Sequence, residues 1–323
     1  EAEQSIPPMG PPPPPKRKRS GAEAAEFFAS PAPHDRYLTA LAESGLHPSI
    51  RGAVLRGDPS CDSVRVTHGP PGCGKTHALL DALQALHESS PDVRCLVAAP
   101  TNVGAADLYT RAFARGLIGC LALAKENMPP GVPRPRAVDL RSARFVFSTV
   151  AGRSGPRLND ERFHAVFLDE AGLCPESIVW GLLRPHVRFL WMVGDPRQLG
   201  AVTSEEGVQL GHQRSIMERL GAVGFPAEYL NVQRRMHPEI AAYPSSAFYD
   251  GSLVTDPSHP LPCPNVSPYS LVDVRSGSSS SSGTSFENVE EAKHACRVAA
   301  ELKRHYPRTV LLTPYSAQLR RLR

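Results

Sequence analysis

The sequence predicts an α/β protein whose core is a parallel β-sheet, and three observations lead to that class. Short apolar segments alternate with amphipathic segments of helical periodicity from about residue 64 onward. Several of the short segments are apolar at nearly every position, which is typical of parallel strands covered on both faces. A glycine-rich loop at Gly69–Thr76 follows the first apolar segment and opens a helical one. Repeated alternation of strands and helices predicts a doubly wound sheet.

The expected elements follow one another along the chain. Strands are expected at residues 64–67, 93–98, 145–148, 165–168 and 187–193, with helices at residues 77–87 and 103–115. A second strand–helix–strand unit is expected near the end, with strands at residues 271–274 and 309–312, a helix at residues 289–305 and a serine/glycine loop at residues 276–283. The predicted organisation is a tail at residues 1–33, a first domain at residues 34–225 and a second domain at residues 226–323.

The tail at residues 1–33 differs in composition from the rest of the chain. Prolines at positions 7–8 and 11–15 precede the basic run Lys16–Arg19. Such a segment cannot bury enough apolar surface to order itself, and consecutive prolines favour an extended helix. We therefore expect disorder. The basic run is typical of a nuclear localisation signal or a nucleic-acid anchor, and equally of a solvated tail without a receptor.

Composition and charge exclude several classes of protein. The chain has 323 residues, 41% of them hydrophobic, which suits one or two globular domains. No apolar stretch approaches the roughly 20 residues of a membrane span. The first residues contain neither an initiator Met nor an apolar signal core, so we expect a piece of a longer chain that is not secreted.

The net charge and the cysteines narrow the choice further. The formal net charge is +4, which Lys16–Arg19 alone accounts for, so any other nucleic-acid contact must come from a local patch. The seven cysteines include no CxxC pair, which argues against a disulfide framework and a structural zinc site. A reducing compartment, cytoplasmic or nuclear, is expected.

The Gly69–Thr76 loop fits the pattern GxxxxGK[ST] in its strand–loop–helix context. Backbone N–H groups of such a loop wrap phosphates, and the helix N-terminus adds a favourable field. We expect Lys75 to face solvent in the empty loop and to reach the β and γ phosphate oxygens, and Thr76 to ligate Mg²⁺. The alternative is a glycine-rich turn without a ligand. The predicted nucleotide-binding residues are Gly69, Pro70, Pro71, Gly72, Cys73, Gly74, Lys75, Thr76 and His77.

A nucleotide site also needs a carboxylate at the end of a neighbouring strand. Asp169 and Glu170 follow the strand expected at residues 165–168. Asp169 is expected to hold the magnesium with Thr76, and Glu170 to polarise the attacking water. A strand ending in two acidic residues is by itself often a solvated cap, so the prediction depends on the phosphate loop upstream.

These residues belong to a longer series of motifs. Asp169–Ala171, Gly194–Leu199 and Leu230–Pro238 resemble motifs II, III and IV of superfamily-one helicases of the up-frameshift, or nonsense-mediated decay, type. Further matches, in the family's order, are Ala99–Asn102, Ser148–Thr149, Tyr243–Leu253, Ser282–Asn288 and Thr313–Tyr315. The resemblance covers about residues 45–323 and implies a P-loop NTPase with a RecA-like parallel-sheet domain followed by a partial second RecA-like domain.

The resemblance also implies roles for individual residues. Gln198 would sense the γ-phosphate or hold the water, and Arg235 would act as an arginine finger; the alternative for Arg235 is a structural arginine at a helix start. The implied catalytic residues are Lys75, Asp169, Glu170, Gln198 and Arg235. Single-stranded nucleic acid would contact Pro100, Thr101, Asn102, Ser148, Thr149, Thr313, Pro314 and Tyr315, although Thr and Asn at strand ends are often helix caps.

The sequence departs from the family in three places. Arg234 stands where the family has an aromatic residue that stacks on adenine. Nidovirus replicative helicases are similar to this sequence in carrying paired arginines there. An arginine plane can also stack on a base. Ile50 stands where a glutamine would read the adenine edge. Other nucleoside triphosphates are therefore candidates beside ATP. The sequence reaches Arg323 before motifs V and VI, so we expect a fragment that holds the N-terminal part of the motor.

The sequence thus predicts an ATP-dependent 5′-to-3′ helicase that hydrolyses ATP to ADP and phosphate while moving along single-stranded RNA or DNA, in a replication or RNA-decay complex. A motor associated with an endonuclease or with recombination is a second hypothesis, for which no nuclease residues are visible. A nucleotide-gated RNA-binding or scaffold protein without unwinding activity is a third. The intact set of Lys75, Asp169, Glu170 and Gln198 argues against that third hypothesis.

Overall fold

The computed structural model describes residues 64–89, 92–133, 139–260 and 267–323. By compactness the chain divides into two units, residues 1–262 and residues 263–323. The tail predicted at residues 1–33, with its basic run, and Ile50 lie outside the described residues. The division falls later than the predicted boundary between residues 225 and 226, because Leu230, Tyr249 and Leu253 pack in the core of the first unit. The predicted domain boundaries stay a prediction.

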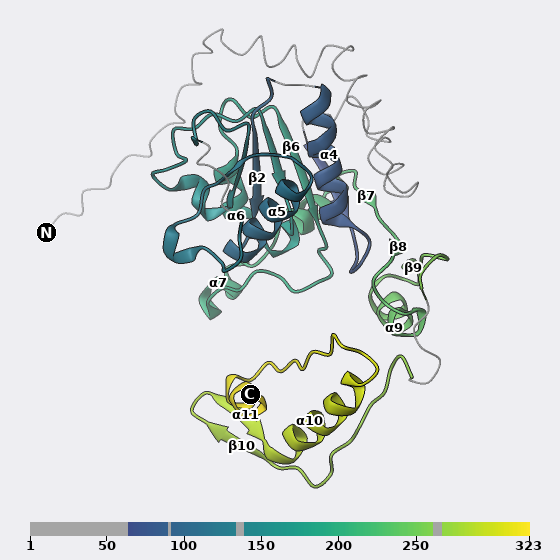
Figure 1. Cartoon of the computed structure of the whole chain (residues 1–323). Helices are drawn as coiled ribbons and strands as arrows, with labels where there is room; N and C mark the ends of the chain where they lie inside the picture. Colours follow the sequence, from purple (N-terminus) through teal and green to yellow (C-terminus); the bar gives the residue numbers. More distant parts are fainter. Residues whose placement is uncertain (1–63, 90–91, 134–138, 261–266) are drawn as a thin grey trace, which may run out of the picture. The chain divides into compact units, whose positions relative to one another are not determined.

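The first unit is built on a seven-stranded sheet with the strand order β3-β4-β2-β5-β6-β1-β7 (Figure 1). All six strand pairs are parallel. Because β1 pairs with β6 and β6 with β5, the loops that leave their carboxyl ends lie side by side, which is where ligands bind in open α/β sheets. The strands are β1 Val64–His68, β2 Cys95–Ala99, β3 Cys120–Leu121, β4 Phe145–Thr149, β5 Ala165–Leu168, β6 Phe189–Gly194 and β7 Glu228–Tyr229.

Helices cover both faces of this sheet, and β6 shows the alternation. Trp191 and Val193 face the core that contains the helices α4 and α5, whereas Leu190 and Met192 face the core on the other side, with α8. Burial on both faces explains why these strands are apolar at nearly every position. The helical elements around this sheet are α4 Lys75–Ser89, α5 Asn102–Ala114, η2 Lys125–Asn127, η3 Ala151–Ser154, η4 Ala171–Leu173, α6 Glu176–Val179, η5 Trp180–Leu182, α7 Glu205–Gln209 and α8 Ile216–Ala222.

The predicted doubly wound sheet is therefore confirmed. All five strands and both helices expected in this unit form, with ends shifted by at most two residues. The two-residue strands β3 and β7 were not predicted. The fold is an α/β P-loop domain of the RecA-like type.

Residues 228–255 extend this unit beyond the sheet. After β7, strand β8 (Val232–Gln233) pairs in parallel with β9 (Val254–Thr255). Between them lies α9 (Pro238–Phe248), which begins with proline at its first position and with the side chain of His237 accepting the N–H of Glu239. Proline suits this position because a backbone N–H in the first turn of a helix has no intrahelical acceptor, so its absence costs no hydrogen bond.

The second unit differs from the expected strand–helix–strand arrangement. Helix α10 (Val289–Lys303) forms as predicted, but the strands expected at residues 271–274 and 309–312 do not. Neither segment finds a strand to pair with among residues 267–323. The expected serine/glycine loop instead contributes β10 (Ser279–Ser282) to an antiparallel hairpin with β11 (Ser285–Asn288). Gly283 takes a φ of +64° in the turn, which glycine adopts without strain. Helix α11 (Ser316–Leu322) closes the unit.

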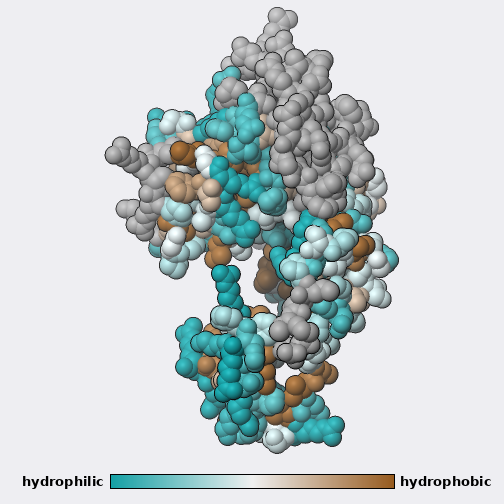
Figure 2. Space-filling view, turned by 45° about the vertical axis from the view of Figure 1, so that its right-hand side comes forward, coloured by the Kyte–Doolittle hydropathy of each residue, from teal (hydrophilic) through white to brown (hydrophobic). Residues whose placement is uncertain are grey.

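The unpaired segments leave apolar side chains at the surface of the second unit, as Figure 2 shows. Leu271 is 88% exposed and Leu312 is 90% exposed. In residues 64–89, 92–133, 139–260 and 267–323, no helix combines the length and the apolar character that crossing a lipid bilayer requires.

Candidate nucleotide site and nucleic-acid edge

The loop between β1 and α4 is anchored at its first residue and turns on its glycines. The N–H of Gly69 donates to the carbonyl of Gly194 at 2.9 Å, which ties the loop to the end of β6. Gly72 and Gly74 have φ angles of +80° and +85°, a region that side chains with a Cβ rarely enter. A loop of this shape leaves its N–H groups free to face an anion.

Lys75 lies folded over this loop. Its Nζ donates to the carbonyl of Gly69 at 2.8 Å, and a Cβ at Gly69 would lie 2.5 Å from the Lys75 Cγ. The side chain is 9% exposed, so the expectation that it faces solvent is wrong. The ammonium takes this carbonyl as its acceptor because a partly buried charge needs a hydrogen-bond partner.

Thr76 and Asp169 meet across two strand ends, as predicted for a metal pair. The Thr76 hydroxyl donates to the Asp169 Oδ2 at 2.9 Å, and Asp169 is 5% exposed. Burial, and next the charge of Glu170, raise the pKa of Asp169 to about 6, against the hydrogen bonds from Thr76 and the Glu170 N–H and the charge of Lys75. A buried carboxylate and a hydroxyl are hard oxygen ligands that suit Mg²⁺, and the cation would relieve the cost of burying the charge.

Glu170 has a left-handed backbone, with φ +50° and ψ +41°. This conformation is uncommon for a residue other than glycine and costs about 1 kcal/mol or more. The turn that follows is packed backbone to backbone against the end of β6, since a Cβ at Gly172 would lie 2.6 Å from the carbonyl oxygen of Asp195. The strained residue and this close contact fix the acidic turn next to the start of the Asp195 loop.

Gln198 lies in that loop, four residues after the end of β6. Its Nε2 donates to the Asp195 Oδ2 at 2.8 Å. A carboxylate oxygen only accepts, so the amide presents its nitrogen to Asp195 and leaves its Oε1 as the free end. The side chain is exposed and follows the strand that pairs with β1, on which the phosphate loop is carried.

Arg235 reaches the phosphate loop through its backbone. A Cβ at Gly72 would lie 2.8 Å from the Arg235 Cβ, and the N–H of Arg234 donates to the carbonyl of Gly72 at 3.1 Å. Gln233, fully buried, organises this contact: its Oε1 accepts the N–H groups of Arg235 and Met236. The guanidinium of Arg235 is exposed. The structure therefore brings Arg235 to the same loop as Lys75 and Thr76.

Arg234 is held by a carboxylate. Its Nε donates to the Asp256 Oδ2 at 2.7 Å. Hydrogen bonds from Ser258, then the bond and charge of Arg234, lower the pKa of Asp256 to about 2, so Asp256 is ionised at neutral pH. The ion pair uses the edge of the guanidinium and not its faces, and stacking on a base stays a prediction.

The strand ends on the far side of the sheet carry the residues predicted to hold nucleic acid. In the β2–β4 register Ala99 pairs with Thr149, which places Pro100, Thr101 and Thr149 at one edge. Thr101 accepts the N–H of Gly104 and caps α5. Thr149 accepts the N–H of Gly152 in the same way.

Asn102 and Ser148 complete the predicted set on this edge. Asn102 opens helix α5 and is half-buried. Ser148 is fully buried and its hydroxyl points to the carbonyl of Ala122 at 3.5 Å. The Ser148 side chain therefore cannot contact single-stranded nucleic acid directly in this structure. His77 is exposed at the first turn of α4 and lies 3.4 Å from Asp81.

Comparison with known proteins gives the family of this chain. Two family descriptions, both AAA domain, match the chain, one over residues 54–220 and the other over residues 212–323. The first match alone spans more than half of the chain. The chain belongs to the AAA domain family. Its motifs resemble those of superfamily-one helicases of the up-frameshift type.

Curated helicases are similar over parts of this chain. The Regulator of nonsense transcripts 1 of Dictyostelium discoideum is 33% identical over 55% of this chain and 14% of its own length. The ATP-dependent helicase NAM7 of Saccharomyces cerevisiae is 27% identical over 79% of this chain and 32% of its own length. The chain thus spans about a seventh to a third of the length of these relatives.

Solved helicase structures are also similar. The arterivirus nonstructural protein 10 helicase with DNA is 17% identical, with a TM-score of 0.43 over 67% of this chain and 46% of that chain. The Bacteroides Pif1 helicase with ADP-AlF3 and single-stranded DNA is 19% identical, with a TM-score of 0.36 over 61% of this chain and 45% of that chain.

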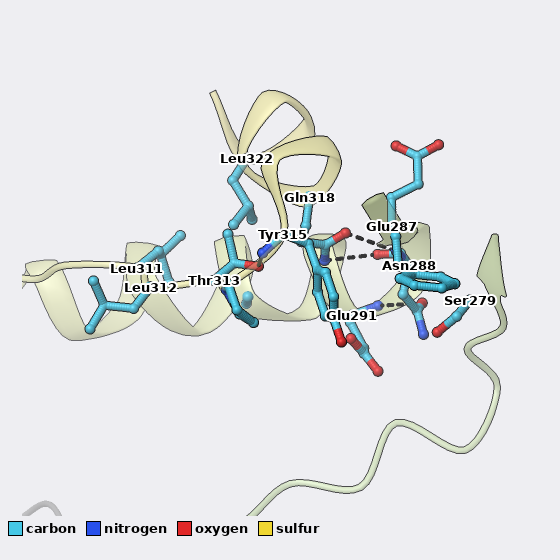
Figure 3. A pocket seen from close by; sticks show the side chains of 13 residues that line it. Ser279, Glu287, Asn288, Glu291, Leu311, Leu312, Thr313, Tyr315, Gln318 and Leu322 are labelled. Atoms are coloured by element: carbon cyan, nitrogen blue, oxygen red, sulfur yellow. Dashed lines mark hydrogen bonds between the residues drawn. The ribbon is translucent and has the colours of Figure 1, made fainter. Parts of the chain in front are cut away.

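The remaining predicted nucleic-acid residues lie in the second unit. Thr313, Pro314 and Tyr315 line a pocket of about 290 Å³ (Figure 3). The ring of Tyr315 packs edge-on against Phe286, with centroids 5.6 Å apart. Gln318 fixes the pocket wall, because its amide both accepts the N–H of Asn288 at 2.8 Å and donates to the carbonyl of the same residue at 3.1 Å.

Three residues to which the sequence analysis assigned no role support the candidate nucleotide site. Gln233 holds the backbone beside Arg235, Asp256 pairs with Arg234, and Tyr249 donates to Asp195. Gln233 and Tyr249 lie inside the quoted motifs, which mark them as candidate site residues but do not reveal what their side chains contact. Asp256 lies outside every motif, and only the fold brings it to Arg234.

Proposed function

We propose that this chain is the nucleotide-binding part of an ATP-dependent helicase that moves 5′ to 3′ along single-stranded RNA or DNA. The observation that carries the proposal is the convergence of motifs on one loop. Lys75, the Thr76–Asp169 pair and the backbone of Arg235 all meet the loop at Gly69–Thr76. A solvated glycine-rich turn has no need of these three contacts.

Each residue of the site has a step in the proposed hydrolysis. Lys75 leaves the Gly69 carbonyl and binds the β and γ phosphate oxygens, as an ammonium does in such loops. Glu170 accepts the proton of the attacking water, and Gln198 orients that water through its free Oε1. Arg235 stabilises charge that builds up on the transferred phosphoryl group.

Magnesium is the expected companion of the nucleotide. Thr76 and Asp169 would hold it, and it would neutralise charge on the phosphates. The buried position of Asp169 and its raised pKa support the fit, because a divalent cation favours the ionised carboxylate that burial disfavours.

ATP is proposed as the nucleotide, with other nucleoside triphosphates as candidates. Stacking on the guanidinium plane of Arg234 accepts any base, since each base offers a π face. The pair with Asp256 would hold that plane in a fixed orientation.

A single strand is proposed to lie along the edge at Thr101 and Thr149. Short polar side chains and backbone N–H groups there suit phosphate and sugar contacts, which carry no demand on base sequence. We propose a cytoplasmic or nuclear location, possible participation in a replication or RNA-decay complex, and no membrane partner; the free thiols of Cys73, Cys95 and Cys174 agree with a reducing compartment.

The experiment uses Glu170→Gln in a chain extended through motifs V and VI of the family. The amide keeps the shape of the side chain but accepts no proton, so ATP should still bind while strand-stimulated turnover falls by about 10²–10⁴-fold. Duplexes with a 5′ or a 3′ single-stranded tail then compare polarity, and unwinding only from the 5′ tail is expected. Full turnover by the variant, or unwinding from the 3′ tail alone, contradicts the proposal.

A nucleotide-gated binding or scaffold protein is the alternative function. Its affinity for single-stranded nucleic acid would change when nucleotide binds, but it would release no phosphate. Phosphate release that depends on the strand in the wild type, and that is lost in Glu170→Gln, separates the two functions. The presence of Lys75, Asp169 and Glu170 favours a hydrolysing helicase over this alternative.

A further inference from the structure

The Asp195–Gln198 loop is tied to the turn that follows helix α9. Asp195 is 4% exposed, and its carboxylate accepts three hydrogen bonds. Its Oδ1 accepts the N–H of Arg197 at 3.0 Å, while its Oδ2 accepts both the Gln198 amide at 2.8 Å and the Tyr249 hydroxyl at 2.7 Å. Gln198 and Tyr249 therefore share one carboxylate oxygen.

A second contact joins the same two segments. The guanidinium of Arg197 donates to the carbonyl of Phe248 and to the Asp250 Oδ2, the latter at 3.0 Å. Both Arg197 and Asp250 are half-exposed or more, and exposed ion pairs contribute little. The buried bond from Tyr249 is therefore the stronger of the two connections.

The Tyr249 hydroxyl is a permanent donor at this place. Its ring is packed in the core of the first unit, 8% exposed. Burial and the hydrogen bond to Asp195 raise the pKa of Tyr249 well above its ordinary value, so the phenol stays protonated in any physiological buffer. A carboxylate buried at this depth needs its donors, and Tyr249 is one of three.

The turn at Tyr249 belongs to the segment that touches the phosphate loop. That segment runs from Gln233, beside Gly72, through α9 to Thr255, and it is closed on itself because Gln233 donates to the Thr255 hydroxyl at 2.7 Å. A shift of Arg235 against the loop would therefore move the Tyr249 turn as well. The hydroxyl would transmit that shift to Asp195.

We propose that Tyr249 is a positioning residue for Gln198. By holding the Asp195 carboxylate, its hydroxyl keeps the Gln198 amide turned with Oε1 toward the terminal phosphate and its water, and it couples this orientation to the segment that carries Arg235. The inference rests on the proposed function, because it acts through the role given there to Gln198. Tyr249 itself touches neither nucleotide nor strand.

The test compares Tyr249→Phe with Tyr243→Phe. The first change keeps the buried ring and removes only the hydroxyl on Asp195. The second removes a hydroxyl from a ring of the preceding helix α9 that is 73% exposed, and serves as the matched control. Two quantities are measured on the full chain: kcat for strand-stimulated ATP hydrolysis, and the ratio of affinities for a non-hydrolysable ATP analogue and for ADP.

Tyr249→Phe is expected to lower kcat about tenfold while the Kd for ADP stays unchanged. The preference for the triphosphate analogue over ADP should shrink as well, a readout that requires no turnover. Tyr243→Phe should match the wild type in kcat and in both nucleotide affinities. A merely structural role would lower the melting temperature and weaken both nucleotides alike.

A double variant shows whether Tyr249 acts through Gln198. In a Gln198→Ala background, Tyr249→Phe should cause no further loss of kcat, because the side chain that it positions is gone. An equal tenfold loss in both backgrounds overturns the proposal, and so does an unchanged kcat and affinity ratio in Tyr249→Phe. If Gln198→Ala itself changes neither quantity, the role proposed for Gln198 has failed, which is a result distinct from the first two.

Discussion

Lys75, Thr76 and Asp169 find hydrogen-bond partners within the candidate site. Lys75 binds a carbonyl of its own loop, and Thr76 binds Asp169. Nucleotide binding must exchange both bonds for bonds to phosphate and metal. The exchange is favourable for Lys75 because its ammonium then faces a negatively charged phosphate oxygen in place of a neutral carbonyl.

Asp169 gives the site a measurable pH dependence. Its folded pKa of about 6 lies above the ordinary value of 3.8, so the stability it contributes is present below pH 3.8 and is lost as the pH rises through 6. Asp169→Asn removes this titration. In EDTA, thermal melting should show the variant to be more stable than the wild type at pH 7.5 by ~3 kcal/mol, with the gain shrinking toward pH 4.

The control for this prediction is Asp107→Asn, which neutralises an exposed carboxylate paired with Arg111 on α5. Its melting temperature should follow the wild type at every pH to within the small effect of a surface pair. A melting difference for Asp169→Asn that is the same at pH 4 and pH 7.5 would contradict the account of its burial.

Arg234 carries the prediction on base recognition. Arg234→Ala should weaken ATP, GTP and CTP to a similar degree, since a guanidinium plane stacks on any base. Arg234→Tyr should largely restore all three affinities, measured by competition with a fluorescent nucleotide. If tyrosine is no better than alanine, the guanidinium acts through its ion pair with Asp256 and stacking is the wrong interpretation.

At the scale of elements, the sequence predicted best where apolar runs mark buried parallel strands. The expected strand at residues 165–168 forms with those same limits as β5, and the glycine-rich loop opens α4 as expected. Phosphate-loop and acidic residues meet because each follows its own strand, and neighbouring parallel strands end at one edge. That consequence of topology can be derived from sequence alone.

Other elements depend on contacts that no local pattern contains. The segments at residues 271–274 and 309–312 have strand-like composition but remain unpaired, because an extended segment becomes a strand only beside a partner. Asp256 reaches Arg234 only through the pairing of β8 with β9. The fold of Lys75 over its own loop depends on which acceptor is near, which residue type does not reveal.

Helical turn η4 and strand β6 give a prediction at this scale. Gly172→Ala places a methyl group 2.6 Å from the Asp195 carbonyl oxygen, so the acidic turn must move away from the Asp195 loop. A loss of about 1–3 kcal/mol of stability is expected, together with a fall in kcat, because Glu170 and Gln198 no longer keep their relative positions.

Gly221→Ala is the matched control for that change. Gly221 lies in α8, and a Cβ there would meet nothing within 4 Å. Alanine in a helix is favoured over glycine by roughly 0.5–1 kcal/mol, so this variant should be slightly more stable than the wild type. Urea unfolding of both variants compares them, and equal effects would mean that the contact with Asp195 does not constrain the turn.

At the scale of the whole molecule, the described contacts of the candidate nucleotide site lie in the first unit. Its parts come from the loop after β1, the ends of β5 and β6 and the segment that begins at β8. Tertiary hydrogen bonds join these parts, through Gly69 to Gly194 and through Gly72 to Arg234. Nucleotide binding by this unit should therefore not require the residues Thr313, Pro314 and Tyr315 of the second unit.

Equilibrium titration of residues 1–323 with a fluorescent ATP analogue and Mg²⁺ tests the central claim, that the Gly69–Thr76 loop is a nucleotide site. Lys75→Met keeps most of the stem packed over Gly69 and removes the ammonium, and Lys293→Met neutralises an exposed lysine of α10 as the control. Loss of one charged hydrogen-bond donor, worth about 1.5–3 kcal/mol, should raise the Kd of Lys75→Met by roughly 10–150-fold, with the Lys293→Met Kd unchanged. Equal affinities for Lys75→Met and the wild type, at equal melting temperatures, would contradict the claim.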